Sequence, residues 1–345
     1  MDIQARRRFS RRFRDELMPG RALVTGCAGF IGSHLCERLL DTGYEVVGVD
    51  CFTDYYERET KESNLTAFLH EPDFEFRPVD LSEGELEGLL DGVSTVFHLA
   101  GQPGVRLSFG KSFETYLRHN LLATQRLLEE AVRSPVDSFV YASSSSVYGD
   151  APAFPCDELA ERRPVSPYGM TKLATEELAA VYHRDFEVPT VGLRYFTVFG
   201  PRQRPDMAFA RFLRLALAGK PLPIYGNGCQ IRDFTYVSDI VDGTIAAAQR
   251  GTPGSVYNLG GGNPVLLRDA VSLIGELVGR PLELERRPGM LGDAVRTGCD
   301  GRRAQRELGF EAKTPLGVGL AAQLESLLNP QNVLARGLAV AGNVA

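Results

Sequence analysis

Short apolar runs alternate along this chain with longer stretches in which apolar residues recur every three or four positions. A short run bounded by turn residues predicts a buried strand, and the longer periodicity predicts an amphipathic helix. Helices are expected between the strands, the longest at residues 112–133 and 167–186. This alternation predicts an α/β fold with a doubly wound parallel sheet, which binds ligands at the carboxyl ends of its strands. The predicted strands lie at residues 22–24, 45–49, 74–79, 95–99, 138–142 and 190–195.

The first predicted strand is followed by a glycine-rich turn that leads into a helix. Gly26, Gly29 and Gly32 punctuate this turn, and Asp50 follows the second predicted strand. Glycines let the backbone approach a pyrophosphate at the helix N-terminus, and an acid about 20 residues further on accepts the adenosine ribose hydroxyls. This order predicts a Rossmann dinucleotide site. Because the Asp50 carboxylate would repel a 2′-phosphate, NAD is favoured over NADP.

Beyond Tyr195 the pattern changes to loops rich in proline, glycine and arginine. These loops alternate with predicted helices at residues 209–218 and 266–278. The change indicates a smaller, discontinuous α+β substrate domain, with the chain returning to the large sheet in between. The expected division is a basic arm at 1–19, an NAD-binding domain at 20–195 plus about 233–260, a substrate domain at about 196–232 plus 261–330, and a tail at 331–345.

The composition is that of an ordinary soluble globular protein of 345 residues, 43% hydrophobic and 24% charged. A net charge of −6 argues against a nucleic-acid partner, and no apolar run reaches the roughly 18 residues needed to cross a bilayer. The cysteines show no Cys-x-x-Cys and no spacing with histidine that would hold a metal. We therefore expect reduced thiols, no metal, no membrane partner and a cytoplasmic location.

Tyr168 and Lys172 are four residues apart in a predicted helix that starts at Pro167 with Ser166 as its cap. Their side chains project from one face of that helix. An ammonium beside a phenol favours the ionised form, so Tyr168 is a candidate base. The serine run at residues 143–146 follows another predicted strand. The alternative interpretations are an ordinary exposed helix turn and a polar strand end.

Five motifs follow one another along residues 21–325: T-G-C-A-G-F-I-G at 25–32, F-H-L-A-G at 97–101, S-S-S-S-V-Y-G at 143–149, Tyr168-x-x-x-Lys172, and R-D-F-T-Y-V at 232–237. Together they resemble the extended short-chain dehydrogenase/reductase family, in its branch of nucleotide-sugar epimerases and dehydratases. Residues 50–56, 102–106 and 194–208 are most similar to UDP-glucuronate 4-epimerases, and relatives that act on neutral UDP-hexoses share part of this pattern.

The resemblance implies a mechanism in which the Tyr168 phenolate removes the proton of the sugar 4-OH while the C4 hydride passes to NAD+. Lys172 lowers the phenol pKa and donates to the nicotinamide ribose, and Ser144 hydrogen-bonds the same alcohol. Ser143 is one residue out of register for that role. NAD is expected to stay tightly bound, with NAD+ as the resting state. The expected cofactor contacts are Gly26, Gly29, Phe30, Ile31, Gly32, Asp50, Asp80, Leu81, Leu99, Ala100, Gly101, Tyr168, Lys172 and Tyr195.

The 4-keto sugar formed in this way can meet several fates, which depend on the acids and bases around it. Dehydratases that this chain resembles carry Asp-Glu after the catalytic Ser or Thr, and UDP-glucuronate decarboxylases usually carry a Glu before Val-Tyr. Ser145 and Ser146 stand at those positions here, which favours simple return of the hydride after the sugar has turned over. The resemblance therefore implies an NAD-dependent 4-epimerase, and UDP-glucuronate decarboxylation and UDP-glucose 4-epimerisation are the alternatives.

Arg204 is the residue expected to read a C5 carboxylate, because a guanidinium offers a bidentate fork, and Thr197 is expected to assist. The alternative is that Arg204 is one of several solvated loop arginines. Arg232 and, more weakly, Arg296 are expected at the diphosphate, and Tyr225 at the uracil. Asn120 is expected to face the site. The full set of expected substrate contacts is Arg106, Ser144, Ser145, Ser146, Thr197, Arg204, Tyr225, Arg232 and Arg296.

Two further expectations concern the protein as a whole. The helices at 112–133 and 167–186 resemble the four-helix dimer interface of the family, so a homodimer is expected. A catalytically inactive NAD(H)-sensing module is the non-enzymatic alternative, and the presence of Tyr168, Lys172 and Ser144 together argues against it.

Overall fold

The computed structural model describes residues 20–150, 153–289, 292 and 294–329. The predicted basic arm at 1–19 and the predicted tail at 331–345 lie outside the described residues. All neighbouring strands of the main sheet run parallel, so the prediction of a doubly wound parallel sheet is confirmed. The sheet has seven strands in the spatial order β3 (Phe74–Arg77), β2 (Glu45–Val49), β1 (Arg21–Thr25), β4 (Thr95–His98), β5 (Ser138–Ser144), β6 (Thr190–Tyr195) and β10 (Ser255–Leu259).

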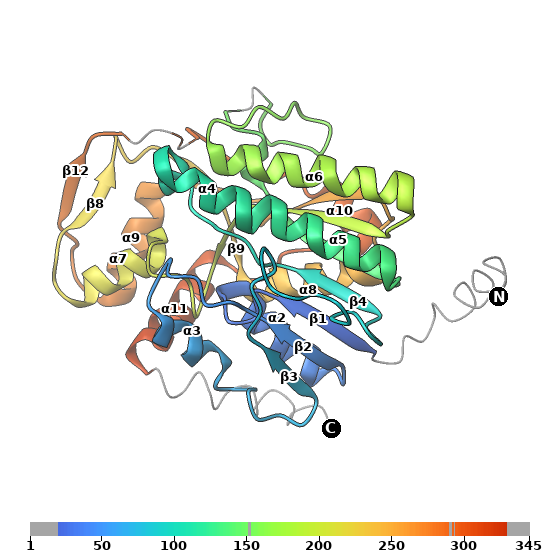
Figure 1. Ribbon diagram of the computed structural model, residues 1–345. Coiled ribbons are helices and arrows are strands. Elements are labelled where there is room, and N and C mark those ends of the chain that lie inside the picture. Colours follow the sequence, from blue (N-terminus) through green and yellow to red (C-terminus); the bar gives the residue numbers. More distant parts are fainter. Residues whose placement is uncertain (1–19, 151–152, 290–291, 293, 330–345) are drawn as a thin grey trace.

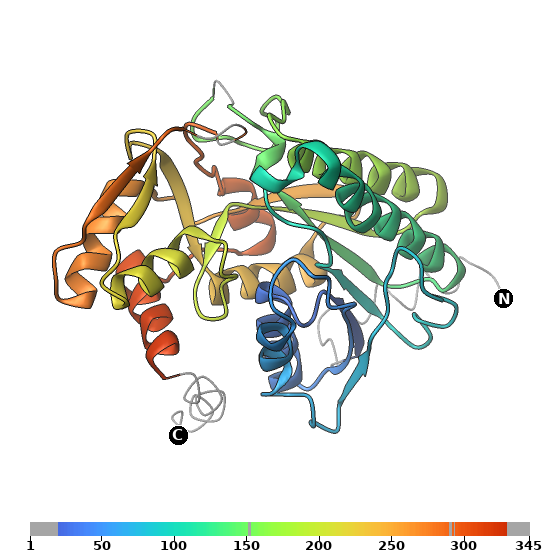
Figure 2. The same cartoon turned by 60° about the vertical axis from the view of Figure 1, so that its left-hand side comes forward.

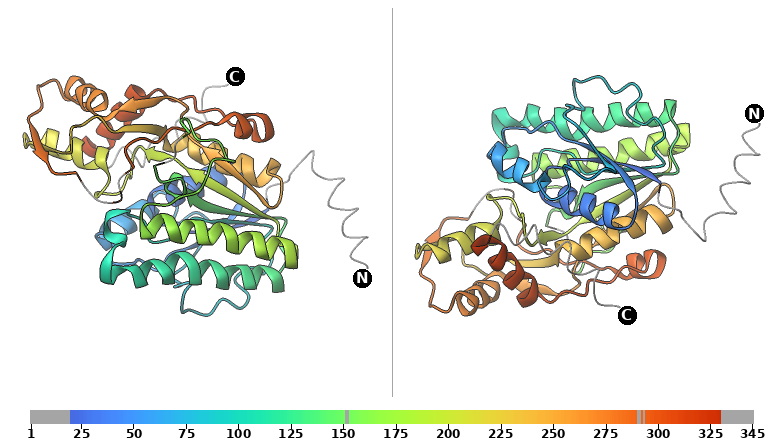
Figure 3. Two further views of the ribbon diagram at one scale, coloured as in Figure 1. Left: turned by 90° about the horizontal axis from the view of Figure 1, so that it is seen from above. Right: turned by 90° about the horizontal axis from the view of Figure 1, so that it is seen from below.

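Helices cover both faces of this sheet (Figures 1 and 3). One face packs against α2 (Phe30–Asp41), α8 (Val237–Arg250) and α10 (Arg302–Leu308), with α3 (Arg58–Leu65) beside α2. The other face packs against α5 (Ala123–Arg133) and α6 (Pro167–Phe186). Strands buried on both faces have near-continuous apolar runs, which is why β1, β5 and β6 were visible in the sequence.

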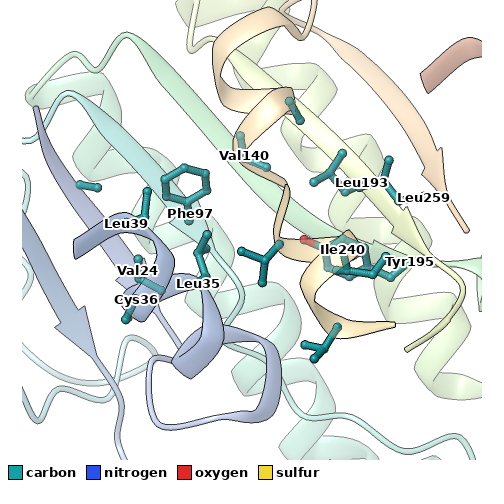
Figure 4. Packing of buried hydrophobic residues seen from close by; sticks show 14 of the residues in the cluster. Val24, Leu35, Cys36, Leu39, Phe97, Val140, Leu193, Tyr195, Ile240 and Leu259 are labelled. Carbon is teal, nitrogen blue, oxygen red and sulfur yellow. The ribbon is translucent and has the colours of Figure 1, made fainter. Parts of the chain in front are cut away.

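The core on the α2 and α8 face lies between the sheet and these helices, and both contribute side chains to it (Figure 4). Val24, Val140 and Leu193 on three strands meet Leu35 of α2 and Ile240 of α8, and each of these is fully buried or within 1% of it. Burying apolar surface at roughly 25 cal/mol per Å² is the main force that holds such layers together.

The long helix predicted at residues 112–133 is present, but it is not uniform. It starts with α4 (Phe113–Tyr116), passes through a π-helical segment, η3 (Leu117–Leu122), and continues as α5. π-helical turns are rare overall, but those that occur inside α-helices are often found near functional sites. The extra residue in the turn changes the direction of the side chains that follow. The hydrophobic period of a sequence does not reveal such a turn.

The residues after β6, apart from α8, β10 and α10, build a smaller part beside the sheet, visible on the left of Figure 1 and brought forward in Figure 2. Its own core lies around Phe199, Phe209 and Phe234, whose rings pack 4.4–6.4 Å apart. Its helices are α7 (Ala208–Leu217), α9 (Leu267–Val278) and α11 (Leu316–Leu328). Its strands are β7 (Thr197–Phe199), β9 (Ile231–Tyr236) and β11 (Pro264–Leu266) in one sheet, and β8 (Leu222–Tyr225) with β12 (Leu284–Arg287) in another.

Candidate active site

A cavity of about 1010 Å³ opens at the carboxyl ends of the main-sheet strands and extends to the smaller part. Every residue expected to contact the dinucleotide lines this cavity. Eight of the nine expected substrate contacts line it as well, and Arg296 is the exception. Ser144, Tyr168 and Lys172, the expected catalytic residues, all line this same cavity.

The glycine turn after β1 has the geometry that a pyrophosphate needs. Gly26 has φ +72°, and a Cβ there would lie 2.9 Å from the Ala100 nitrogen. A Cβ on Gly32 would lie 2.1 Å from the Gly26 oxygen, so α2 packs against the turn only because residue 32 is glycine. Gly29 caps α2 without a side chain. The N-terminus of α2 is therefore close to the cavity and suited to an anion.

Asp50 ends β2 and ties the glycine turn to the loop that follows. Its Oδ2 accepts from the Ala28 N–H at 3.1 Å, and its Oδ1 accepts from the Phe52 N–H at 2.8 Å. Burial raises the pKa of Asp50, although the hydrogen bond from Phe52 and the charge of Lys61 oppose that shift. A carboxylate at this position, with the glycine turn and the helix N-terminus, fits the ribose and pyrophosphate of NAD.

The first turn of α6 carries Tyr168 and packs next to the serine run at residues 143–146. The Ser166 hydroxyl accepts from the Gly169 N–H at 3.1 Å, and Pro167 occupies the first turn, so the predicted cap is confirmed. A Cβ on Gly169 would lie 2.6 Å from the Ser146 oxygen. The glycine therefore allows the start of α6 to approach the turn at Ser145–Val147, which directly follows Ser144. Tyr168 lies in the cavity with its ring 6.2 Å from that of Tyr116.

The pKa of Tyr168 differs from our expectation. Burial raises it above the ordinary value, and the hydrogen bond with Ser144 and the charge of Arg204 oppose this. Lys172 donates from Nζ to the Ala142 oxygen at 2.9 Å, and burial lowers its own pKa to about 8, against the charge of Glu176. Lys172 is not among the groups that shift the pKa of Tyr168, and its ammonium is directed to the Ala142 oxygen instead. Arg204 is the cation that acts on the phenol here.

Successive serines of β5 bond different partners. Ser143 and Ser144 both line the cavity, but the Ser143 hydroxyl donates to Glu176, whereas the Ser144 Oγ accepts from the Ser146 N–H at 3.1 Å. Arg194 clamps both oxygens of Glu176, at 2.9 Å and 2.7 Å, with both side chains almost fully buried. This ion pair anchors the strand ends behind the serines, and sequence spacing did not indicate it.

Asn120 lies behind the cavity rather than in it. Its Oδ1 accepts from the Gln102 N–H at 2.6 Å, and its Nδ2 donates to the Gln102 oxygen at 3.1 Å and to the Thr171 hydroxyl at 3.0 Å. The π-helical segment η3 carries Asn120, which is 1% exposed. We expected Asn120 to face the site. It instead fastens the loop after β4 to α6, because the helix turns its amide towards the backbone.

Arg204 does reach the cavity, but it is not a free loop arginine. Its Nε and Nη2 donate to the two oxygens of Asp206 at 3.0 Å and 3.1 Å. Tyr55, from the loop after β2, donates to Asp206 at 3.1 Å, and the Arg204 guanidinium lies 5.6 Å from the Tyr55 ring. The sequence motifs contained both Tyr55 and Asp206, but gave neither a role.

The far end of the cavity is lined by arginines and one tyrosine. The Arg106 guanidinium lies 4.4 Å from the centre of the Tyr225 ring. Hydrogen bonds from Arg211 and Arg287 lower the pKa of the Tyr225 phenol. Arg211 also lines the cavity, and sequence reasoning missed it because α7 reads as an ordinary amphipathic helix. One face of Tyr225 is therefore covered by a cation.

Arg232 and Arg296 have different positions. Arg232 lines the cavity, and its Nη1 donates to the Ile231 oxygen at 2.9 Å. Arg296 is not among the described residues that line the cavity, and its guanidinium lies 5.0 Å from the Phe154 ring. Arg232 belongs to β9 and Arg296 pairs with Ile231 of the same strand, but only Arg232 is among the described residues that line the cavity.

One cluster of possible metal ligands occurs within the described residues, although the sequence spacing indicated none. Cys51, Asp80 and His119 bring ligand atoms within 4.8 Å of one another. All three line the cofactor half of the cavity, and Asp80 already accepts from the Ser82 N–H at 2.8 Å and its hydroxyl at 2.7 Å. Burial raises the pKa of the Cys51 thiol to about 11, which disfavours the thiolate that a metal needs. We interpret the cluster as part of the cofactor pocket.

A family model described as the NAD dependent epimerase/dehydratase family matches residues 22–260. The chain therefore belongs to this family of extended short-chain dehydrogenases/reductases, as the motifs indicated. Within it, the chain is an enzyme of the NAD-dependent nucleotide-sugar epimerase type, and NAD is its cofactor.

Three relatives illustrate the match. A Bacillus subtilis protein described as an uncharacterized UDP-glucose epimerase, YtcB, is 44% identical over 309 residues, covering 88% of this chain and 97% of its own. The UDP-glucuronate 4-epimerase of Thermodesulfobacterium geofontis is 36% identical over 306 residues, covering 87% and 94%. The crystal structure of Bacillus cereus UDP-glucuronic acid 4-epimerase with UDP-glucuronic acid and NAD has a TM-score of 0.87 and 40% identity, covering 90% of this chain and 99% of that one.

None of the helices in the described part of the chain is both long and apolar enough to cross a membrane. The described cysteines form no disulfide.

Proposed function

We propose that the enzyme is a UDP-glucuronate 4-epimerase, which interconverts UDP-glucuronate and UDP-galacturonate. The observation that carries this proposal is that Tyr168, Ser144 and Arg204 line one cavity, while Ser145 and Ser146 follow Ser144 where related enzymes place acids. The names of the Thermodesulfobacterium and Bacillus cereus relatives support the same substrate.

Bound NAD+ supplies a hydride acceptor for C4 of the sugar. The residues of this chain handle the proton. Tyr168 accepts it from the 4-OH, and Ser144 orients that hydroxyl. Lys172 donates to the Ala142 oxygen and is proposed to donate to the nicotinamide ribose as well. The 4-keto sugar then presents its other face and takes the hydride and proton back.

The C5 carboxylate of the substrate is assigned to Arg204, with Thr197 on the neighbouring cavity wall. A guanidinium binds a carboxylate through two parallel N–H donors and would leave those donors unpaired beside a hydroxymethyl group. A 4-keto uronic acid is a β-keto acid, so a held carboxylate also disfavours loss of CO2. This assignment distinguishes the epimerase from a decarboxylase.

The nucleotide is assigned to the far end of the cavity. Arg232 and Arg106 are proposed to bind the diphosphate, and Arg211 is added to them because it lines the same wall. Tyr225 is proposed to contact uracil with the face that Arg106 does not cover. Arg296, which stacks on Phe154, would have to move to contribute.

A second candidate, UDP-glucose 4-epimerase, is favoured by the name of the relative that is 44% identical. Incubation of the holoenzyme with UDP-glucuronate or with UDP-glucose, followed by proton NMR of the anomeric signals, tests both. UDP-galacturonate as product supports the proposal. UDP-xylose or UDP-4-keto-xylose would replace it with decarboxylation, and turnover of UDP-glucose alone would replace it with the second candidate.

We also propose the domain division expected from the sequence, a homodimer, and a cytoplasmic location. The division of the described residues is supported by separate cores around the main sheet and around Phe199. In addition, α10 packs on α8, so we propose that Arg302–Leu308 supports the NAD-binding part. Light scattering of the purified protein tests the dimer.

A further inference from the structure

The ion pair between Arg204 and Asp206 fixes the orientation of the guanidinium in the cavity. A guanidinium presents two bidentate edges, and Asp206 occupies the edge formed by Nε and Nη2, at 3.0 Å and 3.1 Å. The other edge, formed by Nη1 and Nη2, is the one suited to a second carboxylate. The Arg204 side chain is 20% exposed and that of Asp206 is 38% exposed, so the arginine is the more deeply set of the two.

Tyr55 holds this ion pair from the opposite side of the cleft. Its hydroxyl donates to Asp206 Oδ2 at 3.1 Å, and its ring lies 5.6 Å from the Arg204 guanidinium. Tyr55 follows β2 of the cofactor half, whereas Arg204 and Asp206 lie between β7 and α7 of the smaller part. The three side chains therefore join both walls of the cavity.

Gly104 leaves the space that the Tyr55 hydroxyl occupies. Gly104 has φ +98°, and a Cβ there would lie 2.3 Å from the Tyr55 oxygen and 3.4 Å from the Tyr116 oxygen. A side chain at position 104 would displace Tyr55 from Asp206. The glycine, the tyrosine and the acid thus act as one support.

Arg204 also lies close enough to Tyr168 for its charge to lower the pKa of that phenol. A sugar with its 4-OH at Tyr168 brings its C5 substituent, on the adjacent carbon, into the same part of the cavity. If the Arg204 guanidinium could rotate freely there, it would bind the C5 carboxylate more weakly, because a rotated guanidinium offers one N–H donor to the carboxylate instead of two.

We propose that Asp206, supported by Tyr55, is a positioning residue that orients Arg204 and thereby sets the preference for a UDP-uronate over a neutral UDP-hexose. This proposal rests on the proposed function, since it assumes that Arg204 reads the C5 carboxylate. Asp206 does not contact the reacting atoms in this scheme and acts through Arg204.

Two effects of removing the acid oppose each other, and they can be separated. Loss of the Asp206 charge alone would improve the binding of an anionic sugar, whereas loss of orientation would weaken it. Asp206→Asn changes both. Tyr55→Phe loosens the support and leaves every charge in place, so it reports orientation alone.

The test measures kcat/KM of the NAD-loaded variants for UDP-glucuronate and for UDP-glucose. We expect the uronate-to-hexose ratio to fall about tenfold in Asp206→Asn, which loses a charge-assisted contact to Arg204, and about threefold in Tyr55→Phe, which loses only a hydrogen bond to the supporting carboxylate. In an Arg204→Ala background Tyr55→Phe should not alter the ratio further, and Asp206→Asn should not lower it, because only the effect of the lost acidic charge remains. Asp242→Asn, in the surface pair that Arg38 makes with Asp242 at 2.5 Å, is the matched control and should leave the ratio as it is.

A ratio that stays constant or rises in Asp206→Asn, in an enzyme that converts UDP-glucuronate, would overturn the positioning role alone. An equal fall in the Arg204→Ala background would also overturn it, because the effect would then not pass through Arg204. If the unmodified enzyme converts UDP-glucose only, the proposed function fails and this inference fails with it.

Discussion

Tyr168 is surrounded by groups that act on its proton in opposite directions. Burial raises its pKa, while the Ser144 hydroxyl and the Arg204 charge lower it, and the net result lies above the ordinary value. The phenol is therefore protonated at neutral pH. The positive charge of a bound nicotinamide ring would favour the phenolate, which supports the proposed role of Tyr168 as a base.

The first residue-scale prediction is that Tyr168→Phe lowers turnover of UDP-glucuronate by about 1,000-fold or more, since it removes the proton acceptor and little volume. The variant should retain NAD, which is measured by the absorbance of cofactor released on denaturation. Tyr182→Phe is a matched control on the same helix, because its hydroxyl bonds Glu129 outside the cavity. Loss of NAD from Tyr168→Phe would show that Tyr168 has a different role.

The second residue-scale prediction concerns Arg204→Ala. We expect kcat/KM for UDP-glucuronate to fall by roughly 100-fold, because a bidentate charged contact is lost, and kcat/KM for UDP-glucose to fall less. Steady-state kinetics with both substrates measures the difference. Equal losses on the two substrates would retire the carboxylate-reading role of this arginine.

At the scale of elements, the distance between α6 and the turn at Ser145–Val147 decides whether Tyr168 and Ser144 can both contact the 4-OH of the sugar. Only the absence of a side chain at Gly169 permits that approach, since a Cβ would lie 2.6 Å from the Ser146 oxygen. Behind this contact, the buried pair of Arg194 and Glu176 and the amide of Asn120 hold the neighbouring segments.

We therefore predict that Gly169→Ala lowers kcat by about 10- to 100-fold, because it pushes the start of α6 away from Ser144. Gly317→Ala in α11 is the matched control, since a Cβ there meets its nearest neighbour at an ordinary 3.7 Å. Kinetics and thermal unfolding of both variants separate misplacement from instability. A Gly169→Ala enzyme with full kcat would show that the contact is dispensable.

At the scale of the whole molecule, the main sheet and the helices on it enclose polar groups that must stay uncharged. His98 lies between Thr25 and Thr124, at 2.8 Å and 2.9 Å, and burial together with Lys172 lowers its pKa to about 3. His34 bonds the Pro201 oxygen at 3.0 Å, and burial lowers its pKa to about 3 as well. Both rings are neutral in the folded protein at neutral pH.

These histidines predict a loss of stability in acid. Between the unfolded pKa near 6.5 and the folded value of about 3, the unfolded chain binds the extra proton. The free energy of unfolding should therefore fall as the pH falls through that window. Denaturant titrations of wild type and His98→Asn measure it. The variant should show a shallower dependence by up to one proton, and an identical slope would contradict the assignment.

The sequence by itself determined the class of fold and the cofactor half of the site. Apolar runs identify strands buried on both faces, and the glycine turn with Asp50 identifies a dinucleotide site, because these features depend on residues close together in the chain. Tyr168, Lys172 and Ser144 could be predicted for the same reason. Ser144 lies at the end of a recognisable strand, and the other two lie just after a recognisable helix start.

Only the tertiary structure decided the electrostatics and the contacts between distant segments. It showed that burial outweighs Ser144 and Arg204 at the phenol, that the Asn120 amide bonds the backbone of Gln102, and that Arg296 stacks on Phe154. It also brought Tyr55 to Asp206, 151 residues away along the chain. Desolvation and long-range contacts depend on how layers pack, which no local pattern of residues encodes.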